Sequence, residues 1–222
     1  HITADEKWRD EILSDAEALI GDEFTEKFTG FSDPGKNRQL SIYNGLCDIC
    51  GLTVAGSDTA DTNNTTHTED KEYESNSENR HFQDTAVTDD IVIVHDAARP
   101  FVSADLLERC IEACAIHDGA MPALPMKDTV YLSEDGVSVT SLLERSKIYA
   151  GQAPEAFRLE KYLEATKALL PDEILKINGS TEPAIRAGLD IAIIPGDENN
   201  FKVTTDIDLK KCRDILCNPG IV

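Results

Sequence analysis

Three short apolar runs, each followed at once by polar residues, constrain the fold of this chain more than any other feature. They span residues 91–94, 120–124 and 191–194. Runs of this length, rich in β-branched or small apolar residues, are typical of strands buried on both faces. Amphipathic segments at 103–114 and 159–166 separate them. This alternation predicts an α/β fold: a mostly parallel sheet flanked by helices.

Helix and turn signals extend this reading to both ends of the chain. Residues 3–20 are predicted to form a helix that Thr3 caps and Gly21 ends. A second helix is expected near Gln39. Thr205 or Asp206 is expected to cap the last helix, which turns three residues toward the core, Leu209, Cys212 and Leu216.

An antiparallel arm is expected at residues 127–152. Residues 130–132 and 137–139 are β-prone and flank Ser133-Glu134-Asp135-Gly136. Such a turn sequence between two extended runs favours a hairpin.

Length and composition predict one domain spanning residues 1–222, with one anomalous segment. The 222 residues are enough for one good core and few for two domains. Residues 51–90 are dominated by Ser, Thr, Asn, Asp and Glu, and such a segment buries too little apolar area to offset its ordering entropy. We therefore predict a disordered acidic insertion there. The sequence shows no apolar run of membrane-spanning length and no signal peptide, so no membrane partner and a cytoplasmic location are expected.

The formal charge of −21 at pH 7 restricts the class of ligand. It argues against a general nucleic-acid binder, whose affinity comes from neutralising phosphates with basic residues. A small phosphorylated substrate remains compatible if cations are concentrated locally or a divalent ion takes part. The Cys47–Cys50 pair has zinc-ligand spacing, but no second pair follows. Reduced structural thiols are favoured over a metal or disulfide site.

The segment after the first apolar run carries the strongest chemical signal. There an acid, two small residues, a base and a proline follow His95: Asp96, Ala97, Ala98, Arg99 and Pro100. In open α/β sheets ligands bind at the carboxyl ends of strands. Asp96 is therefore a candidate metal ligand and Arg99 a candidate phosphate ligand, while the small Ala97 lets a ligand approach the backbone.

Three further loop segments have the same character. Residues 35–41, 127–129 and 199–204 each place a cation next to a predicted element. Any one of them alone is better explained by a turn or a solvated surface charge. The presence of all four charged loop segments in one α/β fold favours a phosphorylated ligand.

These segments resemble the polyol-phosphate cytidylyltransferases, in the order found in that family. The family covers enzymes acting on 2-C-methyl-D-erythritol 4-phosphate and the related enzymes acting on ribitol 5-phosphate. The matching segments are Asn37 to Leu46, His95 to Phe101, Lys127 to Thr129, Gly151 to Phe157 and Pro195 to Thr204. The resemblance implies a nucleotide-diphospho-sugar transferase-like fold. It also implies transfer of CMP from CTP to a polyol phosphate with release of pyrophosphate.

The resemblance also implies roles for individual residues. Asp96 would bind Mg²⁺ at the triphosphate, Lys202 would stabilise charge at the α-phosphate, and Arg99 would support the polyol or the Asp96 loop. Ser41 and the Gly35 backbone would contact the cytosine. Thr129 and Arg145 would hold the phosphate of the polyol across a homodimer interface made by the 127–152 arm.

Departures from the family pattern leave alternatives open. The family's first strand and its glycine-rich phosphate loop have no counterpart here, so we expect an N-terminally truncated domain lacking roughly 60 residues. Ala153 replaces a Thr, and residues 178–182 replace an acidic element. The alternatives are ribitol 5-phosphate as acceptor, a catalytically impaired fragment, or an acidic interaction protein acting through residues 51–90.

Overall fold

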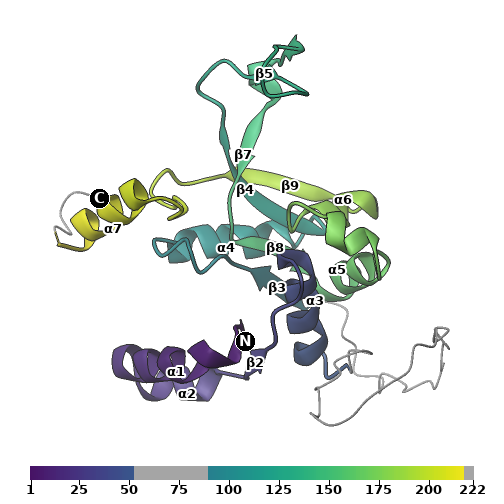
Figure 1. Cartoon of the computed structure of the whole chain (residues 1–222). Helices are drawn as coiled ribbons and strands as arrows, with labels where there is room; N and C mark the ends of the chain where they lie inside the picture. Colours follow the sequence, from purple (N-terminus) through teal and green to yellow (C-terminus); the bar gives the residue numbers. More distant parts are fainter. Residues whose placement is uncertain (53–89, 218–222) are drawn as a thin grey trace, which may run out of the picture.

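A computed structural model describes residues 1–52 and 90–217. The centre of the fold is a five-stranded sheet (Figure 1). Its strands are β3 (Ile91–Val94), β4 (Gly119–Pro125), β7 (Tyr149–Gly151), β8 (Glu155–Arg158) and β9 (Ile191–Pro195). The predicted insertion at 51–90 lies almost wholly outside the described residues.

The sheet is mixed, which refines the prediction of a mostly parallel one. The three predicted apolar runs form β3, β4 and β9, and all three point the same way: β4 pairs parallel with β9, while β3 and β4 both pair antiparallel with β8. Strand β8 is thus inserted between β3 and β4. It takes this central place because Ala156 and Phe157 bury on opposite faces of the sheet. The predicted α/β class is confirmed.

Helices cover both faces of this sheet. Successive side chains of β3 point to opposite faces, and those on each face pack against helices. Val92 and Val94 face a core shared with α3 (Arg38–Ile49) and α5 (Leu159–Lys167). Ile91 and Ile93 instead pack toward the buried thiols of Cys110, within α4 (Ala104–Ala113), and Cys114, the residue that follows this helix. These cysteines act as apolar core groups, as predicted.

Side-chain caps mark where α4 and α3 begin. The Ser103 side chain accepts a hydrogen bond from the backbone N–H of Leu106, as predicted for α4. The Asn37 side chain likewise caps α3 by accepting from the N–H of Leu40. Two short elements complete the α5 side of the sheet, η2 (Glu173–Lys176) and α6 (Glu182–Arg186).

The N-terminal residues form a small unit beside α3 (Figure 1). It contains β1 (Ile2–Thr3), α1 (Glu6–Ile20), α2 (Asp22–Lys27) and β2 (Phe31–Ser32). Thr3 was predicted to cap α1, but it lies in β1, paired with Ser32, because the backbone there joins a two-stranded parallel ladder. Asp5 is the cap instead, and Gly21 ends the helix as predicted.

The predicted arm projects from the sheet beyond β7 (Figure 1). Its strands are β5 (Tyr131–Leu132) and β6 (Ser141–Leu142), followed by η1 (Arg145–Lys147). The second hairpin strand was expected at 137–139 and lies later, because Asp135 accepts hydrogen bonds from the N–H groups of Val137 and Ser138 and holds them in the turn.

The last helix, α7 (Asp206–Cys217), corrects another prediction. It begins where expected, and Asp208 accepts hydrogen bonds from the Thr204 and Thr205 backbone. Its apolar side chains do not reach the core: Leu216 is 68% exposed, and no residue of the helix is buried. Among the described residues, no helix is long and apolar enough to cross a membrane.

Candidate functional site

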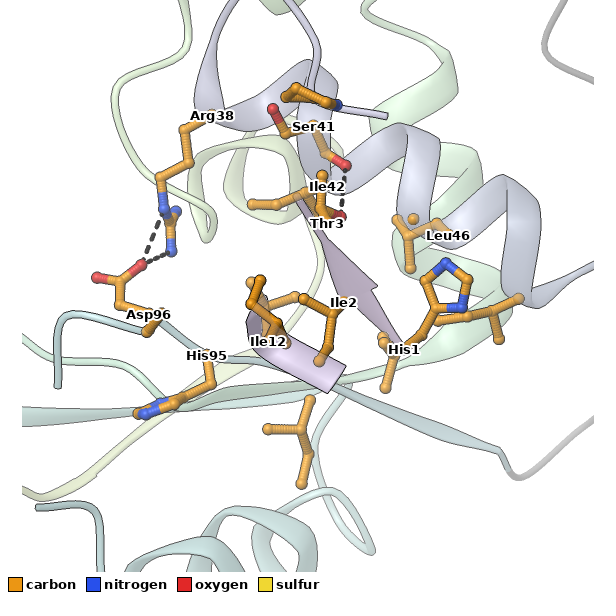
Figure 2. Close-up of a pocket in the computed structure, with 17 residues that line it drawn as sticks. His1, Ile2, Thr3, Ile12, Arg38, Ser41, Ile42, Leu46, His95 and Asp96 are labelled. Atoms are coloured by element: carbon orange, nitrogen blue, oxygen red, sulfur yellow. Dashed lines mark hydrogen bonds and ion pairs between the residues drawn. The ribbon is translucent and has the colours of Figure 1, made fainter. Parts of the chain in front are cut away.

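Asp96 lies two residues after the end of β3 and is the centre of a cluster of charged side chains. Arg38, in the first turn of α3, donates two hydrogen bonds to Oδ1 of Asp96, from Nε at 3.0 Å and from Nη2 at 2.6 Å. Figure 2 shows the Arg38 side chain reaching from α3 to this carboxylate. The pairing joins the N-terminus of a helix to the carboxyl end of a strand, which is where α/β folds place ligands.

Two more cations approach the other oxygen of Asp96. Nζ of Lys202 lies 3.1 Å from Oδ2, and Nε of Arg99 lies 3.9 Å from it. Burial alone would raise the pKa of Asp96, but Arg38 and Lys202 outweigh burial and hold that pKa below its ordinary value. The carboxylate is therefore ionised at neutral pH, and three positive groups surround it.

A buried asparagine braces the loop that carries Lys202. Asn200 is fully buried, and its Nδ2 donates to the carbonyl of Ala153 at 2.7 Å. The carbonyl of Asn200 accepts from Nη1 of Arg99 at 2.7 Å.

Two further hydrogen bonds hold the same loop. Gln152 donates to the carbonyl of Asp197 at 2.8 Å, and the N–H of Val203 donates to the carbonyl of Ala98 at 2.8 Å. This network fixes the 197–203 loop against the strand ends that carry Asp96.

A cavity of about 620 Å³ opens beside the Asp96 cluster. Its polar lining includes Arg38, Ser41 and Asp96 (Figure 2). Ala97 also lines the cavity. Its apolar wall comes from the N-terminal unit, α3 and β3: Ile2, Ile12, Ile42, Leu46, Val92 and Ile93. The site thus combines an apolar wall with a cationic end, which suits a ligand with a ring and a phosphate chain.

Gly35 and Ser41 form one local unit next to this cavity. The backbone N–H of Gly35 donates to Oγ of Ser41 at 2.9 Å, and Oγ of Ser41 in turn donates to the carbonyl of Asn37 at 2.9 Å. A Cβ at position 35 would lie 2.6 Å from Cβ of Leu40, so only glycine fits there without rearrangement.

Three of the four predicted loop segments come together in the structure, and the fourth, residues 127–129, lies next to them. Residues 35–41, 95–99 and 199–204 meet around Asp96. Lys127 pairs with Glu198, next to the Lys202 loop. Thr129 and Arg145 lie within the 127–152 arm, and Nη1 of Arg145 donates to the Lys127 carbonyl at 2.8 Å. Within one chain these two arm residues do not join the Asp96 cluster.

Sequence reasoning did not assign Arg38, Ser180, Glu155 or Thr181 to the site. Nη1 of Arg38 donates to Oγ of Ser180 at 2.8 Å, and Thr181 donates to the buried carboxyl of Glu155 at 2.8 Å. The sequence signals were that Arg38 is a cation in the charged segment 35–41 and that Arg38 and Glu155 fall inside two of the matching segments. Ser180 and Thr181 lie in a segment that departs from the family pattern.

Comparison with known proteins identifies the family to which this arrangement belongs. The sequence model described as IspD: 2-C-methyl-D-erythritol 4-phosphate cytidylyltransferase matches residues 74–218. The chain belongs to this family. A curated IspD-family relative, 2-C-methyl-D-erythritol 4-phosphate cytidylyltransferase of Geobacillus kaustophilus, is 30% identical over 195 residues, covering 87% of this chain and 68% of the relative.

Other relatives are longer than this chain. A bifunctional enzyme IspD/IspF of Paramagnetospirillum magneticum is 34% identical over 133 residues, which are 60% of this chain. The chain thus spans only about a third of that relative's length, since the match covers 34% of it.

Solved structures of the IspD family share the fold. The 4-diphosphocytidyl-2C-methyl-D-erythritol synthase of Anaerococcus prevotii superposes with a TM-score of 0.68 at 20% identity, covering 98% of this chain and 78% of the other. The 2-C-methyl-D-erythritol 4-phosphate cytidylyltransferase of Thermus thermophilus gives 0.59 at 22% identity, covering 84% and 73%. The predicted family and fold are therefore confirmed.

Proposed function

We propose that this protein transfers CMP from CTP to 2-C-methyl-D-erythritol 4-phosphate and releases pyrophosphate, a step in isoprenoid precursor synthesis. The convergence of Arg38, Arg99 and Lys202 on Asp96, next to a partly apolar cavity, is the observation that carries this proposal. Phosphoryl transfer depends mainly on positioning the reactants and neutralising their charge, and this cluster supplies both.

Each residue of the cluster has a distinct role in the proposed reaction. An oxygen of the acceptor phosphate attacks the α-phosphorus of CTP in line, and the bond to pyrophosphate breaks. Lys202 lies at the α-phosphate and stabilises the charge that develops in the transition state. Arg38 binds phosphate oxygens from the helix N-terminus, where the backbone dipole also favours an anion. Arg99 supports the loop of Asp96.

The cytosine occupies the cavity between α3 and β3. Ser41 and the N–H groups of the 35–41 segment supply hydrogen-bonding partners for the base, because Ser41 lines the cavity and is held by Gly35. Ala97 allows the ribose and phosphates to approach the backbone after β3.

Mg²⁺ is the proposed cofactor, with Asp96 as its protein ligand. The donor set fits: Mg²⁺ is commonly held by one or two carboxylates, and phosphate oxygens of the substrate supply further ligands. Asp96 provides one ionised carboxylate at the edge of the cavity. No group of three or more potential ligand side chains occurs among residues 1–52 and 90–217. Phosphate oxygens of the substrate would therefore have to supply the other ligands. When bound, Mg²⁺ neutralises charge on the triphosphate.

The arm at 127–152 is proposed to join two copies of the chain in a homodimer. It exposes a run of apolar side chains: Tyr131, Leu132, Val137, Val139 and Leu142. A second copy would cover them and bring Thr129 and Arg145 of one arm toward the polyol phosphate at the other site. Substituting Tyr131 and Leu142 with Arg is expected to give a monomer in sedimentation experiments, whereas an unchanged mass would contradict this role.

We propose a cytoplasmic location as well. The use of cysteine as buried core thiols is typical of proteins from reducing compartments. Fractionation of cells of the source organism with an antibody to the protein tests this. Recovery in a membrane or extracellular fraction would contradict it.

Acceptor-dependent pyrophosphate release is the experiment that tests the proposed reaction. The protein is incubated with CTP and Mg²⁺, together with either 2-C-methyl-D-erythritol 4-phosphate or ribitol 5-phosphate. Release that depends on the methylerythritol compound supports the proposal. Release with ribitol 5-phosphate alone would reassign the acceptor, and no release with either would contradict the reaction.

A further inference from the structure

Helix α7 contributes no buried residue to the described structure, yet it is attached to the segment that carries Lys202. Figure 1 shows α7 at the end of the extended segment that leaves β9. The Asp208 carboxylate, in the first turn of α7, accepts hydrogen bonds from the N–H groups of Thr204 at 3.1 Å and Thr205 at 2.9 Å. The helix therefore lies next to the proposed catalytic lysine, and burial in the core does not explain its presence there.

The ring of Phe201 is a second point of contact between α7 and this segment. Phe201 directly precedes Lys202 in the sequence. Nζ of Lys211, in the second turn of α7, lies over the Phe201 ring at 3.9 Å from its centre. An ammonium group in this position is attracted to the negative face of the ring.

Phe101 packs against the same ring from the segment that carries Asp96. The centres of the Phe101 and Phe201 rings are 5.5 Å apart, and the ring planes are tilted by 34°. This separation is typical of an attractive aromatic pair. We call Phe101, Phe201 and Lys211 the aromatic clasp. The clasp links α7, the Lys202 segment and the Asp96 segment through side chains alone.

Backbone hydrogen bonds hold the Lys202 segment on either side of the clasp. The carbonyl of Asn200 accepts from Nη1 of Arg99, and the N–H of Val203 donates to the carbonyl of Ala98. Between these two bonds, the backbone groups of residues 201 and 202 make no hydrogen bond within the described part of the chain. Because one stretch of backbone carries both side chains, an anchored Phe201 ring limits how far that backbone can rotate at Lys202.

We propose that Phe201 and Lys211 are positioning residues: together with Phe101 they hold the backbone at Lys202 so that its ammonium group stays 3.1 Å from Oδ2 of Asp96. Helix α7 then supports the site rather than the core. This deepens the proposed cytidylyl transfer and rests on it for its effect on turnover. The effect on the position of Lys202 does not depend on that reaction.

The first test needs no turnover and uses Phe201→Leu. The wild-type Phe201 ring should shift the NMR signals of the Lys211 ε-methylene protons upfield of those of Lys210, and Phe201→Leu should remove that shift. Acetic anhydride then probes Lys202, because pairing with Asp96 keeps its ammonium group protonated and slows acetylation. We expect acetylation of Lys202 to be several-fold faster in Phe201→Leu and that of Lys210 to be unchanged.

The second test measures turnover in matched lysine variants. Lys211→Met removes the cation of the clasp, and Lys210→Met removes the same charge from the neighbouring exposed position on α7. We expect kcat to fall several-fold in Phe201→Leu and Lys211→Met while KM for CTP changes little, because a misplaced catalytic group lowers the rate more than binding. Lys210→Met should match wild type.

Conservative variants separate the clasp from a folding defect. Phe201→Tyr keeps an aromatic ring and Lys211→Arg keeps a cation that can lie over it, so both should retain near wild-type kcat. Lys211→Met changes only an exposed side chain, so it decides the question even if Phe201→Leu fails to fold.

Unchanged acetylation of Lys202 in Phe201→Leu and Lys211→Met would overturn the inference, as would a kcat in Lys211→Met equal to that of Lys210→Met. If wild-type protein releases no pyrophosphate, the proposed reaction fails. The acetylation experiment still decides whether the clasp positions Lys202.

Discussion

Arg38 binds Asp96 through two nitrogens on one carboxylate oxygen, across a sequence separation of 58 residues. This pair ties the first turn of α3 to the end of β3 and closes the cationic end of the cavity. The same guanidinium reaches Ser180 through its third nitrogen. Arg38 therefore organises three segments of the site at once, as the planar fork of an arginine allows and a lysine does not.

Replacing Arg38 with Gln is expected to raise the pKa of Asp96 toward its ordinary value of 3.8. A depressed carboxylate pKa adds stability above the unfolded-state pKa, and that stability is lost as pH falls through the folded-state pKa. The variant should therefore be less stable than wild type near neutral pH, and the difference should shrink in strong acid. Chemical unfolding across this pH range measures it. A difference independent of pH would show that Arg38 does not set this pKa.

Arg38→Lys provides a matched control for the same site. It retains the positive charge but loses the two-nitrogen contact and the bond to Ser180. We expect turnover to fall by about tenfold or more, because one flexible ammonium group replaces a fixed fork. Full activity of Arg38→Lys would mean that charge alone accounts for this residue.

Gly35→Ala tests the close packing beside Ser41. The added Cβ would meet Cβ of Leu40 at 2.6 Å and its carbonyl carbon at 2.7 Å, so the 35–41 segment must shift. We expect a loss of about 1–3 kcal/mol in the free energy of unfolding, the usual cost of overpacking, and weaker binding of CTP. Gly179→Ala is the control, because no atom lies within 4 Å of its added Cβ. Equal stability of the two variants in thermal unfolding would contradict this packing.

Asn200→Ala tests the brace behind Lys202. It leaves the buried Ala153 carbonyl without its donor, at an expected cost of about 1–3 kcal/mol. The loop that carries Lys202 also becomes free to move, so kcat should fall more than KM rises. Calorimetric unfolding and steady-state kinetics measure the two effects. Lower stability with unchanged kcat would limit Asn200 to a structural role.

Local sequence patterns predicted the strands and the charged loops. The features that the sequence did not predict depend on contacts between residues far apart in the chain. Ile91–Val94 and the Ser103 cap were readable because strand composition and capping depend on neighbouring residues. The place of β8 in the sheet depends on its pairing with β3 and β4, which lie far from it in the sequence. The apolar residues of α7 predicted a buried face, and in the described structure that helix has no buried residue.

The site residues likewise divide into those that local patterns predicted and those that only long-range contacts reveal. Asp96 and Lys202 were predicted because each follows a recognisable strand or motif, and the structure places them 3.1 Å apart. Glu155 and Thr181 interact across 26 residues from two segments that gave no joint signal. Thr129 and Arg145 remain proposals, since their role depends on a second copy of the chain.

Pyrophosphate release by Lys202→Ala tests the central claim most directly. The assay uses CTP, Mg²⁺ and 2-C-methyl-D-erythritol 4-phosphate, with Lys210→Ala as the control because Lys210 is an exposed lysine on the adjoining helix α7. If Lys202 stabilises the transition state, its loss should lower kcat by about 100-fold or more, and Lys210→Ala should match wild type. Wild-type turnover in Lys202→Ala would contradict the proposal that the charged cluster around Asp96 carries the reaction.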